Sequence, residues 1–406
     1  MILIDLIFYA IGAYILLTTG YLFFLTVAAW FFKKKTTPRG SISSVTVVIP
    51  AHNEALGITQ TIDSIQGADF PPGTDLKSVP IRIVVIADNC DDDTARVAKD
   101  AGVRVMERSD TQNRGKGQAL DWFFKNHKKE YDRMDSVAII DADTLIHPRF
   151  FTEICDSLSH PEVQVVQGFY GVSNPKENWR TALSAAALCV FHHIRPAGRN
   201  RVHATAGLKG NGMAFETKII QRFGWPAFSI VEDIEFSMHL LLENILVHYN
   251  PDAIVFGEMA SKSDQAQTQR KRWEGGRVQL LKQYTGSLFL GFLKNHTFMF
   301  LDAFMELFTP PLSLVVAGQL LLFSISFLFY PQMLILWGLC LYATALYVFS
   351  GLILKKAPFY VWRSLFCAPF FILWKIPVYF KLAGKKGIPG WERTKRASEI
   401  KEETDK

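Results

Sequence analysis

Two carboxylates directly follow a short apolar segment in the middle of the chain, with a spacing that suits a divalent cation. Residues 137–140 (VAII) are rich in β-branched side chains, and Asp141 and Asp143 come next in the sequence Asp-Ala-Asp. Such a run predicts a buried strand of a parallel sheet. Because side chains alternate along a strand, the two aspartates would share one face and supply oxygen ligands for Mg2+ or Mn2+, with a diphosphate completing the site. The alternative is a strand that ends in a solvated acidic turn.

Residues that follow an earlier apolar run would lie at the same edge of the sheet. Residues 45–49 are followed by Pro50, which is expected to stop the strand, and by His52 and Glu54 in the sequence PAHNEA. In open α/β sheets, ligands bind outside the carboxyl ends of the strands. We therefore expect Pro50, His52 and Glu54 to border a site for a nucleobase and its ribose. The alternative is a turn in which Asn53 or Glu54 only caps the next helix.

A further acidic strand end and a lysine between glycines extend this predicted nucleotide site. Residues 81–87 precede Asp88, whose carboxylate can accept hydrogen bonds from a nucleobase or a ribose. The aspartates at 91–93 are assigned instead to the cap of a helix at 94–100. Lys116, in NRGKGQAL, could contact a phosphate. The chain has no Gly-x-x-x-x-Gly-Lys-Ser/Thr sequence, so a nucleotide-hydrolysing P-loop is not predicted.

The segments that carry these residues alternate between strand and helix patterns from about residue 43 onward. Alternating strands and helices predict βαβ units, and hence an α/β fold with an open, mostly parallel sheet. The strands are predicted at residues 45–49, 81–87, 103–106, 137–140, 163–168 and 211–215, and the helices at 58–66, 94–100, 117–124 and 233–243. Transmembrane α-helices are expected to flank this sheet.

Two later motifs add an acidic pair and a basic, aromatic group. VEDIEF places Glu232 and Asp233 at the start of a predicted helix, where acids also stabilise the positive end of the helix dipole. QRKRW supplies Gln269, Arg272 and Trp273. The alternative for this second motif is a basic helix with a tryptophan anchor at a membrane surface.

Taken in order, Asp88, Asp141-Ala-Asp143, Glu232-Asp233 and Gln269-x-x-Arg272-Trp273 resemble the signature of the membrane-embedded family 2 glycosyltransferases. That group includes the cellulose, hyaluronan, chitin and poly-N-acetylglucosamine synthases. The resemblance covers roughly residues 43–284.

The resemblance implies a role for each motif. Asp233 would be the general base, with Glu232 beside it, and direct displacement would convert an α-linked donor into a β-linked product. Asp143 and Asp141 would hold the metal and the diphosphate, and Arg272 would face the phosphates. Trp273 would stack under the acceptor sugar, with Gln269 hydrogen bonding nearby. The residues assigned to the nucleotide sugar are Pro50, His52, Glu54, Asp88, Lys116, Asp141 and Arg272.

The loop at residues 207–215 (GLKGNGMAF) resembles the acceptor-side loop of the same family. Gly210 and Asn211 would then contact the acceptor. In this chain, Gly-Asn-Gly replaces the cysteine- or proline-containing forms of some polymer synthases, and this departure leaves the identity of the acceptor open.

Composition and charge indicate a soluble domain between membrane segments. The chain has 49% hydrophobic residues, and their excess collects at residues 6–32 and after residue 288. The predicted organisation is a transmembrane helix within 1–40 (spanning 6–32), a cytosolic domain at 41–283, an interfacial amphipathic helix at 284–306, a membrane region at 307–382 and a charged cytosolic tail at 383–406.

Within the membrane region, residues 307–329 and 333–354 are predicted to span. Residues 357–380 are expected to be re-entrant or interfacial, because Arg363 and Lys375 are costly to bury in lipid. The five scattered cysteines fit reduced thiols in a cytosolic domain. No segment interleaves basic and aromatic residues in the pattern typical of nucleic-acid binding, so nucleic acid is not a predicted partner.

The function that follows is inverting transfer of a sugar from a UDP-sugar to a growing glycan at the cytosolic face of the inner membrane, with Mg2+ or Mn2+ as cofactor. Transfer of a single sugar to a lipid-linked acceptor, such as a polyprenyl phosphate or glycolipid, is the enzymatic alternative. A non-catalytic scaffold that binds nucleotide is the alternative of another class. An export partner for the product is left open.

Overall fold

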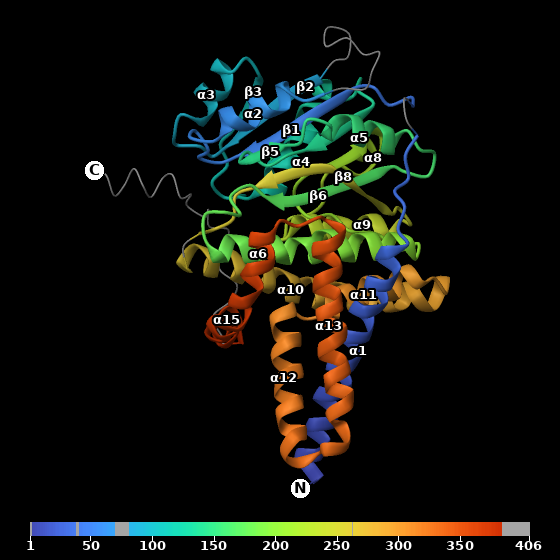
Figure 1. The fold of residues 1–406 in the computed structure, drawn as a ribbon. Coiled ribbons are helices and arrows are strands. Elements are labelled where there is room, and N and C mark those ends of the chain that lie inside the picture. The colour runs from blue at the N-terminus through green and yellow to red at the C-terminus, as the bar shows by residue number, and fades with distance from the viewer. Residues whose placement is uncertain (1, 38–39, 70–80, 262, 384–406) are drawn as a thin grey trace, which may run out of the picture. The chain divides into compact units, whose positions relative to one another are not determined.

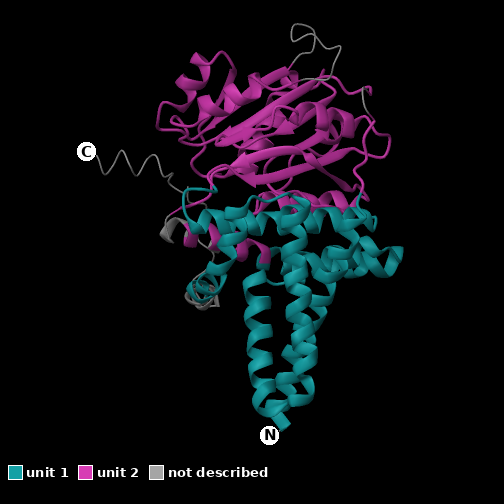
Figure 2. Cartoon of the chain, viewed as in Figure 1, with its two compact units in different colours: residues 1–32, 175–204, 278–387 teal, residues 33–174, 205–277, 388–406 magenta. Residues whose placement is uncertain are grey.

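The chain forms two compact units, each described here by itself (Figure 2). The computed structural model describes residues 2–37, 40–69, 81–261 and 263–383. One unit comprises the described residues within 33–174 and 205–277, and the other comprises those within 2–32, 175–204 and 278–383. Residues 175–204 thus group with the apolar helices rather than with the domain predicted at 41–283. The predicted tail at 383–406 lies almost entirely outside the described residues.

The first of these units is built on an eight-stranded sheet with the order β3-β2-β1-β4-β7-β6-β8-β5 (Figure 1). The four strands β1 to β4 include the parallel pairs β1–β2, β1–β4 and β2–β3. Strands β6 and β8 are also parallel, whereas β7 and β5 run antiparallel to their neighbours. The strands are β1 Val45–Ala51, β2 Ile81–Asp88, β3 Arg104–Arg108, β4 Ser136–Ile139, β5 Thr144–Ile146, β6 Val165–Val172, β7 Met213–Glu216 and β8 Val247–Gly257.

Helices pack on this sheet and bury its apolar strands. Val47, Ile62, Val85 and Phe151 share one fully buried cluster that joins strands to helices. Strands covered on both faces are typically apolar throughout, and these strands were therefore recognisable in the sequence as continuous apolar runs. The helices of this unit are α2 Ile58–Gln66, α3 Thr94–Asp100, α4 Lys116–Asn126, η1 Lys128–Glu130, α5 Phe150–Leu158, α8 Thr217–Phe223, α9 Glu232–Leu242 and the first part of α10 Ser263–Asn295.

The predicted elements are confirmed, with one correction at β1. The helices predicted at 58–66 and 94–100 have those bounds in the structure. Pro50, however, does not stop β1, which continues through it to Ala51. β4 pairs with β1 only as far as Val48, so beyond that point the strand needs no N–H donor toward β4. Pro50 still lies opposite Ile86 of β2.

The other unit is helical. Three of its helices are long and apolar enough to cross a membrane: Ile2–Trp30, Leu312–Phe329 and Pro331–Leu354. The elements of this unit are α1 Ile2–Trp30, α6 Trp179–Cys189, the π-helix η2 Val190–Ile194, α7 Arg195–Arg201, the end of α10, α11 Phe298–Phe308, α12 Leu312–Phe329, η3 Pro331–Met333, α13 Leu334–Leu354, α14 Phe359–Ser364, η4 Leu365–Cys367 and α15 Ala368–Ala383.

The segment at 284–306 differs from the single amphipathic helix expected for it. α10 continues to Asn295, His296 has a φ of +50°, and α11 begins at Phe298. The acidic residues of α11 do not face the outside of this unit. Asp302 is 0% exposed and Glu306 is 8% exposed, so their charges require partners inside the fold.

Two arginines of α7 are those partners. Arg199 Nε donates to Asp302 Oδ2 at 2.7 Å, and the hydroxyl of Tyr21 on α1 donates to Asp302 Oδ1 at 2.9 Å. Arg195 lies 3.3 Å from Glu306 and donates through Nε to the Tyr347 hydroxyl of α13 at 2.9 Å. Buried ion pairs therefore join α7 to α11, and the hydrogen bonds of Tyr21 and Tyr347 tie α1 and α13 to them within the helical unit.

Replacing Arg199 by methionine is expected to destabilise the protein by about 3–5 kcal/mol, because Asp302 keeps its buried charge without a counterion. Thermal unfolding of the purified protein in detergent measures this loss. Arg201→Met, at an exposed position of the same helix, is the matched control and should leave the unfolding temperature unchanged. The double variant Arg199→Met, Asp302→Leu should recover most of the loss. Equal stability of Arg199→Met and Arg201→Met would show that the pair contributes nothing.

Candidate active site

The polar residues singled out from the sequence come from strand ends and helix starts of the sheet-containing unit. Asp88 is the last residue of β2, and Asp141 and Asp143 follow β4. Lys116 begins α4, and Glu232 and Asp233 begin α9. The carboxyl ends of parallel strands meet at one edge, which brings these side chains together.

Lys116 is the positive centre of this arrangement. Its ammonium group lies 2.5 Å from Asp141 Oδ1 and 3.8 Å from Glu232 Oε1, and it donates to the backbone carbonyl of Gly210. Burial alone would lower the pKa of Lys116, but the negative charges of Asp141 and Glu232 outweigh it and raise this pKa. The lysine is therefore held in its charged form by the carboxylates around it.

Glu232 and Asp233 form the acidic pair of the site. Burial raises the pKa of Glu232 to about 7; Lys116 opposes this rise, and the neighbouring charge of Asp233 adds to it. Burial also raises the pKa of Asp233, again against the effect of Lys116. A carboxylate with a raised pKa accepts a proton more readily than an exposed one. The pair can therefore act as a general base near neutral pH.

The loop before β7 holds the first aspartate in place. Asn211 accepts a hydrogen bond from the Asp141 backbone N–H at 3.2 Å and donates to the Thr144 hydroxyl at 2.6 Å. Asn211 is 0% exposed, so in this conformation its side chain positions Asp141 and cannot make the acceptor contact expected from the sequence. Gly210 has a φ of +81°, and a Cβ there would lie 3.3 Å from Asp233 Oδ2.

Tyr170 of β6 belongs to the site, although no motif pointed to it. Burial raises the pKa of Tyr170, as do the charges of Asp143 and Asp141, whereas a hydrogen bond with Asn211 and the charge of Arg272 lower it. The tyrosine thus lies within electrostatic reach of both aspartates and of Arg272.

α10 also runs close to the residues that precede the acidic pair. A Cβ at Gly276 would lie 2.8 Å from the Val231 side chain, so only glycine permits this approach. On the same helix, the Arg270 guanidinium lies over the Trp273 ring, 5.4 Å from its centroid. Gln269 is partly buried. The expected acceptor contacts of Gln269 and Trp273 stay predictions.

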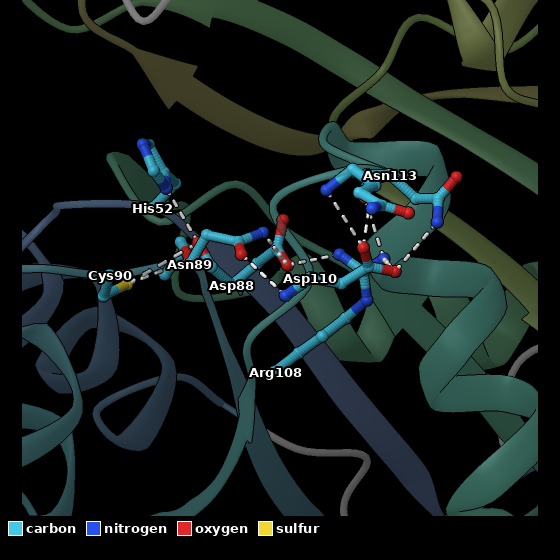
Figure 3. Close-up of polar contacts among 9 residues, drawn as sticks. His52, Asp88, Asn89, Cys90, Arg108, Asp110 and Asn113 are labelled. Atoms are coloured by element: carbon cyan, nitrogen blue, oxygen red, sulfur yellow. Dashed lines mark hydrogen bonds and ion pairs between the residues drawn. The ribbon is translucent and has the colours of Figure 1, made fainter.

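A second group of polar residues surrounds Asp88 (Figure 3). His52 Nδ1 lies 2.7 Å from the Asp88 carbonyl oxygen, and because a carbonyl only accepts, this nitrogen carries the hydrogen. Glu54 donates its backbone N–H to the Thr94 hydroxyl at 2.7 Å, which fixes the turn after β1. Burial raises the pKa of Asp88, and Arg108 opposes that rise. Arg108 was not singled out from the sequence, because a basic residue at the end of a short exposed strand gives no signal of burial.

The residues present suit a divalent cation only in part. Among the described residues, no group of three or more histidine, cysteine, aspartate or glutamate side chains could hold a metal ion. Asp141 and Asp143 supply carboxylate oxygens, which are the ligands that Mg2+ and Mn2+ prefer. A cation held there would take its remaining ligands from a bound diphosphate and water.

Comparisons with known proteins agree on one family. The model of the glycosyltransferase like family 2 matches residues 43–276. The probable glycosyltransferase YdaM of Bacillus subtilis (strain 168) is 23% identical over 276 residues, which is 66% of this chain and 62% of YdaM. The probable glucomannan 4-beta-mannosyltransferase 14 of Arabidopsis thaliana is 25% identical over 170 residues, which is 41% of this chain and 32% of that protein. The matches thus span less than two thirds of either relative.

A solved structure shares the fold. The mannosyltransferase PcManGT from Pyrobaculum calidifontis, in complex with GDP-Man and Mn2+, superposes with a TM-score of 0.55 at 16% sequence identity. The superposition covers 94% of this chain and 99% of that chain.

Replacing Lys116 by methionine is expected to destabilise the protein more at pH 8 than at pH 5. The pKa of Glu232 rises from 4.5 to about 7 on folding, so its contribution to stability is complete below the lower value and is lost as the pH rises through about 7. Without the ammonium group, the pKa values of Glu232 and Asp233 rise further, and the loss at pH 8 grows.

Thermal unfolding of the parent and the variant at both pH values measures this difference. Lys125→Met removes an exposed lysine that pairs with Asp121 on the surface of α4, and serves as the control whose effect is small at either pH. An equal loss of stability at pH 5 and pH 8 for Lys116→Met would contradict the role of Lys116 as the counterion of the acidic pair.

Proposed function

This chain belongs to glycosyltransferase family 2, whose members use nucleotide sugars, and from that membership we propose that it is a membrane-bound inverting transferase that extends a β-linked glycan from a UDP-sugar. The observation that carries the proposal is the cluster of Asp141, Glu232 and Asp233 around the Lys116 ammonium group. Such a cluster combines a base for the attacking hydroxyl with positive charge for a leaving diphosphate.

The proposed reaction is a single displacement. The acceptor hydroxyl gives its proton to Asp233 and its oxygen forms a bond to the anomeric carbon. The bond from that carbon to the diphosphate oxygen breaks, and the electron pair leaves with the UDP. Attack opposite the leaving group inverts the anomeric configuration. Lys116 and Arg272 stabilise the negative charge that develops on the diphosphate.

Asp141 and Asp143 would hold Mg2+ or Mn2+ together with the diphosphate oxygens. When bound, the ion supplies additional positive charge at the leaving group. A cation held there would take the place of the Lys116 ammonium group as the partner of Asp141. The Mn2+ in PcManGT agrees with the class of cation proposed.

The acceptor is proposed to be a growing glycan, because Trp273 offers an aromatic surface for a sugar ring beside Gln269. Transfer of one sugar to a lipid-linked acceptor is the second candidate. The small number of candidate spans among the described residues favours it, since three helices leave little room for a glycan channel. A nucleotide-binding scaffold is disfavoured because every proposed metal, base and phosphate-contacting residue is present.

The three apolar helices are proposed to anchor the protein in the inner membrane. Lys33, Lys34 and Lys35 follow the first span, and Lys355 and Lys356 follow the third. Because basic residues next to spans stay on the cytosolic side, the N-terminus would lie outside and the sheet-containing unit in the cytosol.

Asp233→Asn is expected to lower the rate of UDP release by at least about 100-fold, because the amide cannot accept the acceptor's proton. The assay screens UDP-sugars with Mg2+ or Mn2+ on purified protein in detergent, and product size separates glycan from glycolipid. Asp132→Asn, at an exposed position of the same unit, is the control.

Two outcomes of this assay would count against the proposal. Equal rates for Asp233→Asn and Asp132→Asn would remove Asp233 as the base. A parent protein that binds UDP but releases none from any donor and acceptor tested would favour the scaffold.

Gly210→Ala is expected to slow the same reaction by about 10-fold or more, because its Cβ would crowd Asp233 Oδ2 at 3.3 Å. Gly102→Ala is a matched control, since Gly102 has a similar φ of +77° but no heavy atom within 4 Å of the added Cβ. Both variants should lose about 1–2 kcal/mol of stability from the left-handed backbone. If both also kept the parental rate, the loop would not be shaping the position of the base.

A further inference from the structure

The carboxylate of Asp88 is fixed by an arginine on the neighbouring strand (Figure 3). Asp88 and Arg108 are the last residues of β2 and β3 and lie opposite each other in the parallel register. The Asn89 backbone N–H donates to the Arg108 carbonyl at 2.7 Å, which holds the two strand ends together. Arg108 Nη1 donates to Asp88 Oδ1 at 2.6 Å.

Arg108 is itself held from the loop that follows β3. Its Nη2 donates to Asp110 Oδ2 at 2.9 Å and to the Asn113 backbone carbonyl at 2.8 Å. The side chain of Arg108 is only 5% exposed and that of Asp88 only 9%. The guanidinium therefore cannot swing away from Asp88 without breaking these three contacts, of which the one with Asp88 is buried.

These contacts make the two carboxylate oxygens of Asp88 differ in the number of hydrogen bonds that they accept. Oδ1 accepts from Arg108 and also from the Asn89 side-chain amide at 2.9 Å, whose own oxygen accepts the Asp110 N–H at 2.7 Å. Oδ2 makes no hydrogen bond with any residue that the structure describes. The carboxylate thus offers one oxygen to a ligand, in a fixed direction.

The two common bases of nucleotide-sugar donors differ in the number of donors on the edge that a carboxylate binds. Uracil presents a single N–H, at N3, between two carbonyl oxygens. Guanine presents two adjacent donors, at N1 and at the exocyclic N2, which pair best with both oxygens of one carboxylate. A guanine at Asp88 would have to compete with Arg108 for Oδ1.

We propose that Arg108 is a positioning residue that selects uridine over guanosine donors, because it occupies one oxygen of Asp88 and leaves the other for a single N–H. This inference rests on the proposed function in assigning the nucleobase to Asp88. It goes beyond that function in naming the residue that decides which base is accepted.

The experiment measures the Kd values of UDP and GDP for the full-length protein in detergent, with equal concentrations of Mg2+ or Mn2+. UDP should bind at least about 10-fold more tightly than GDP, the worth of roughly one hydrogen bond to a charged group. GDP binding as tight as UDP binding in the parent protein would overturn the inference without recourse to any variant.

Arg108→Met tests the residue itself. It removes the charged donor from Oδ1 and leaves only the neutral Asn89 amide there, so the ratio of the GDP Kd to the UDP Kd should fall about 10-fold or more, whereas general damage to the site would weaken both nucleotides alike. Arg104→Met is the matched control: Arg104 is on the same strand, pairs with Glu130 and is 58% exposed, so its loss should leave the ratio unchanged. An unchanged ratio in Arg108→Met would overturn the assignment.

The ratio of the GDP Kd to the UDP Kd is measured without any sugar transfer. Free nucleotides need no acceptor, so a protein that prefers UDP but transfers no sugar would contradict the proposed function and leave the base selection standing. Transfer from a GDP-sugar at a rate equal to that from a UDP-sugar would contradict the base selection and leave the proposed sugar transfer standing.

Discussion

The ammonium group of Lys116 is the charge on which the proposed active site depends. Asp141 follows β4, whereas Glu232 and Asp233 begin α9, and the fold collects their charges around one ammonium group. Like charges at such distances repel strongly, and one buried cation offsets that repulsion. Burial raises the pKa of Glu232 and Asp233 so that the pair can accept a proton, and the Lys116 charge lowers these pKa values and so opposes permanent protonation.

The position of Lys116 is set by the glycines on either side of it. Gly115 has a φ of +121°, which allows the chain to turn into α4. A Cβ at Gly117 would lie 2.1 Å from the carbonyl oxygen of Ala227, so α4 can start against that loop only with glycine at this position. The Gly-Lys-Gly sequence is weak as a motif because many turns share it, yet here both glycines have a steric reason.

The sequence predicted six of the eight strands and the acidic strand ends, because each is a local pattern of an apolar run followed by polar residues, whereas β5 and β8 were not predicted. Arg108 and Tyr170 escaped prediction, since their importance arises from what lies beside them in the fold: Arg108 contacts Asp88 of the neighbouring strand, and Tyr170 lies within electrostatic reach of Asp141 and Asp143. Asn211 was identified, but its burial and hydrogen bonds give it a positioning role that spacing alone cannot reveal. Asp302 and Glu306 were read as interfacial charges because the arginines that neutralise them lie about a hundred residues away.

That separation has a consequence for the order in which the chain is made. Arg199 leaves the ribosome 103 residues before Asp302, which at roughly 5–20 residues per second is an interval of about 5–20 s. During this time the guanidinium groups of α7 have no acidic partner from α11 and need water or lipid head groups around them. Residues 205–277, which complete the sheet-containing unit, are all synthesised within the same interval. The sheet-containing unit can therefore be fully synthesised before Asp302 and Glu306, the counterions of Arg199 and Arg195, have been made.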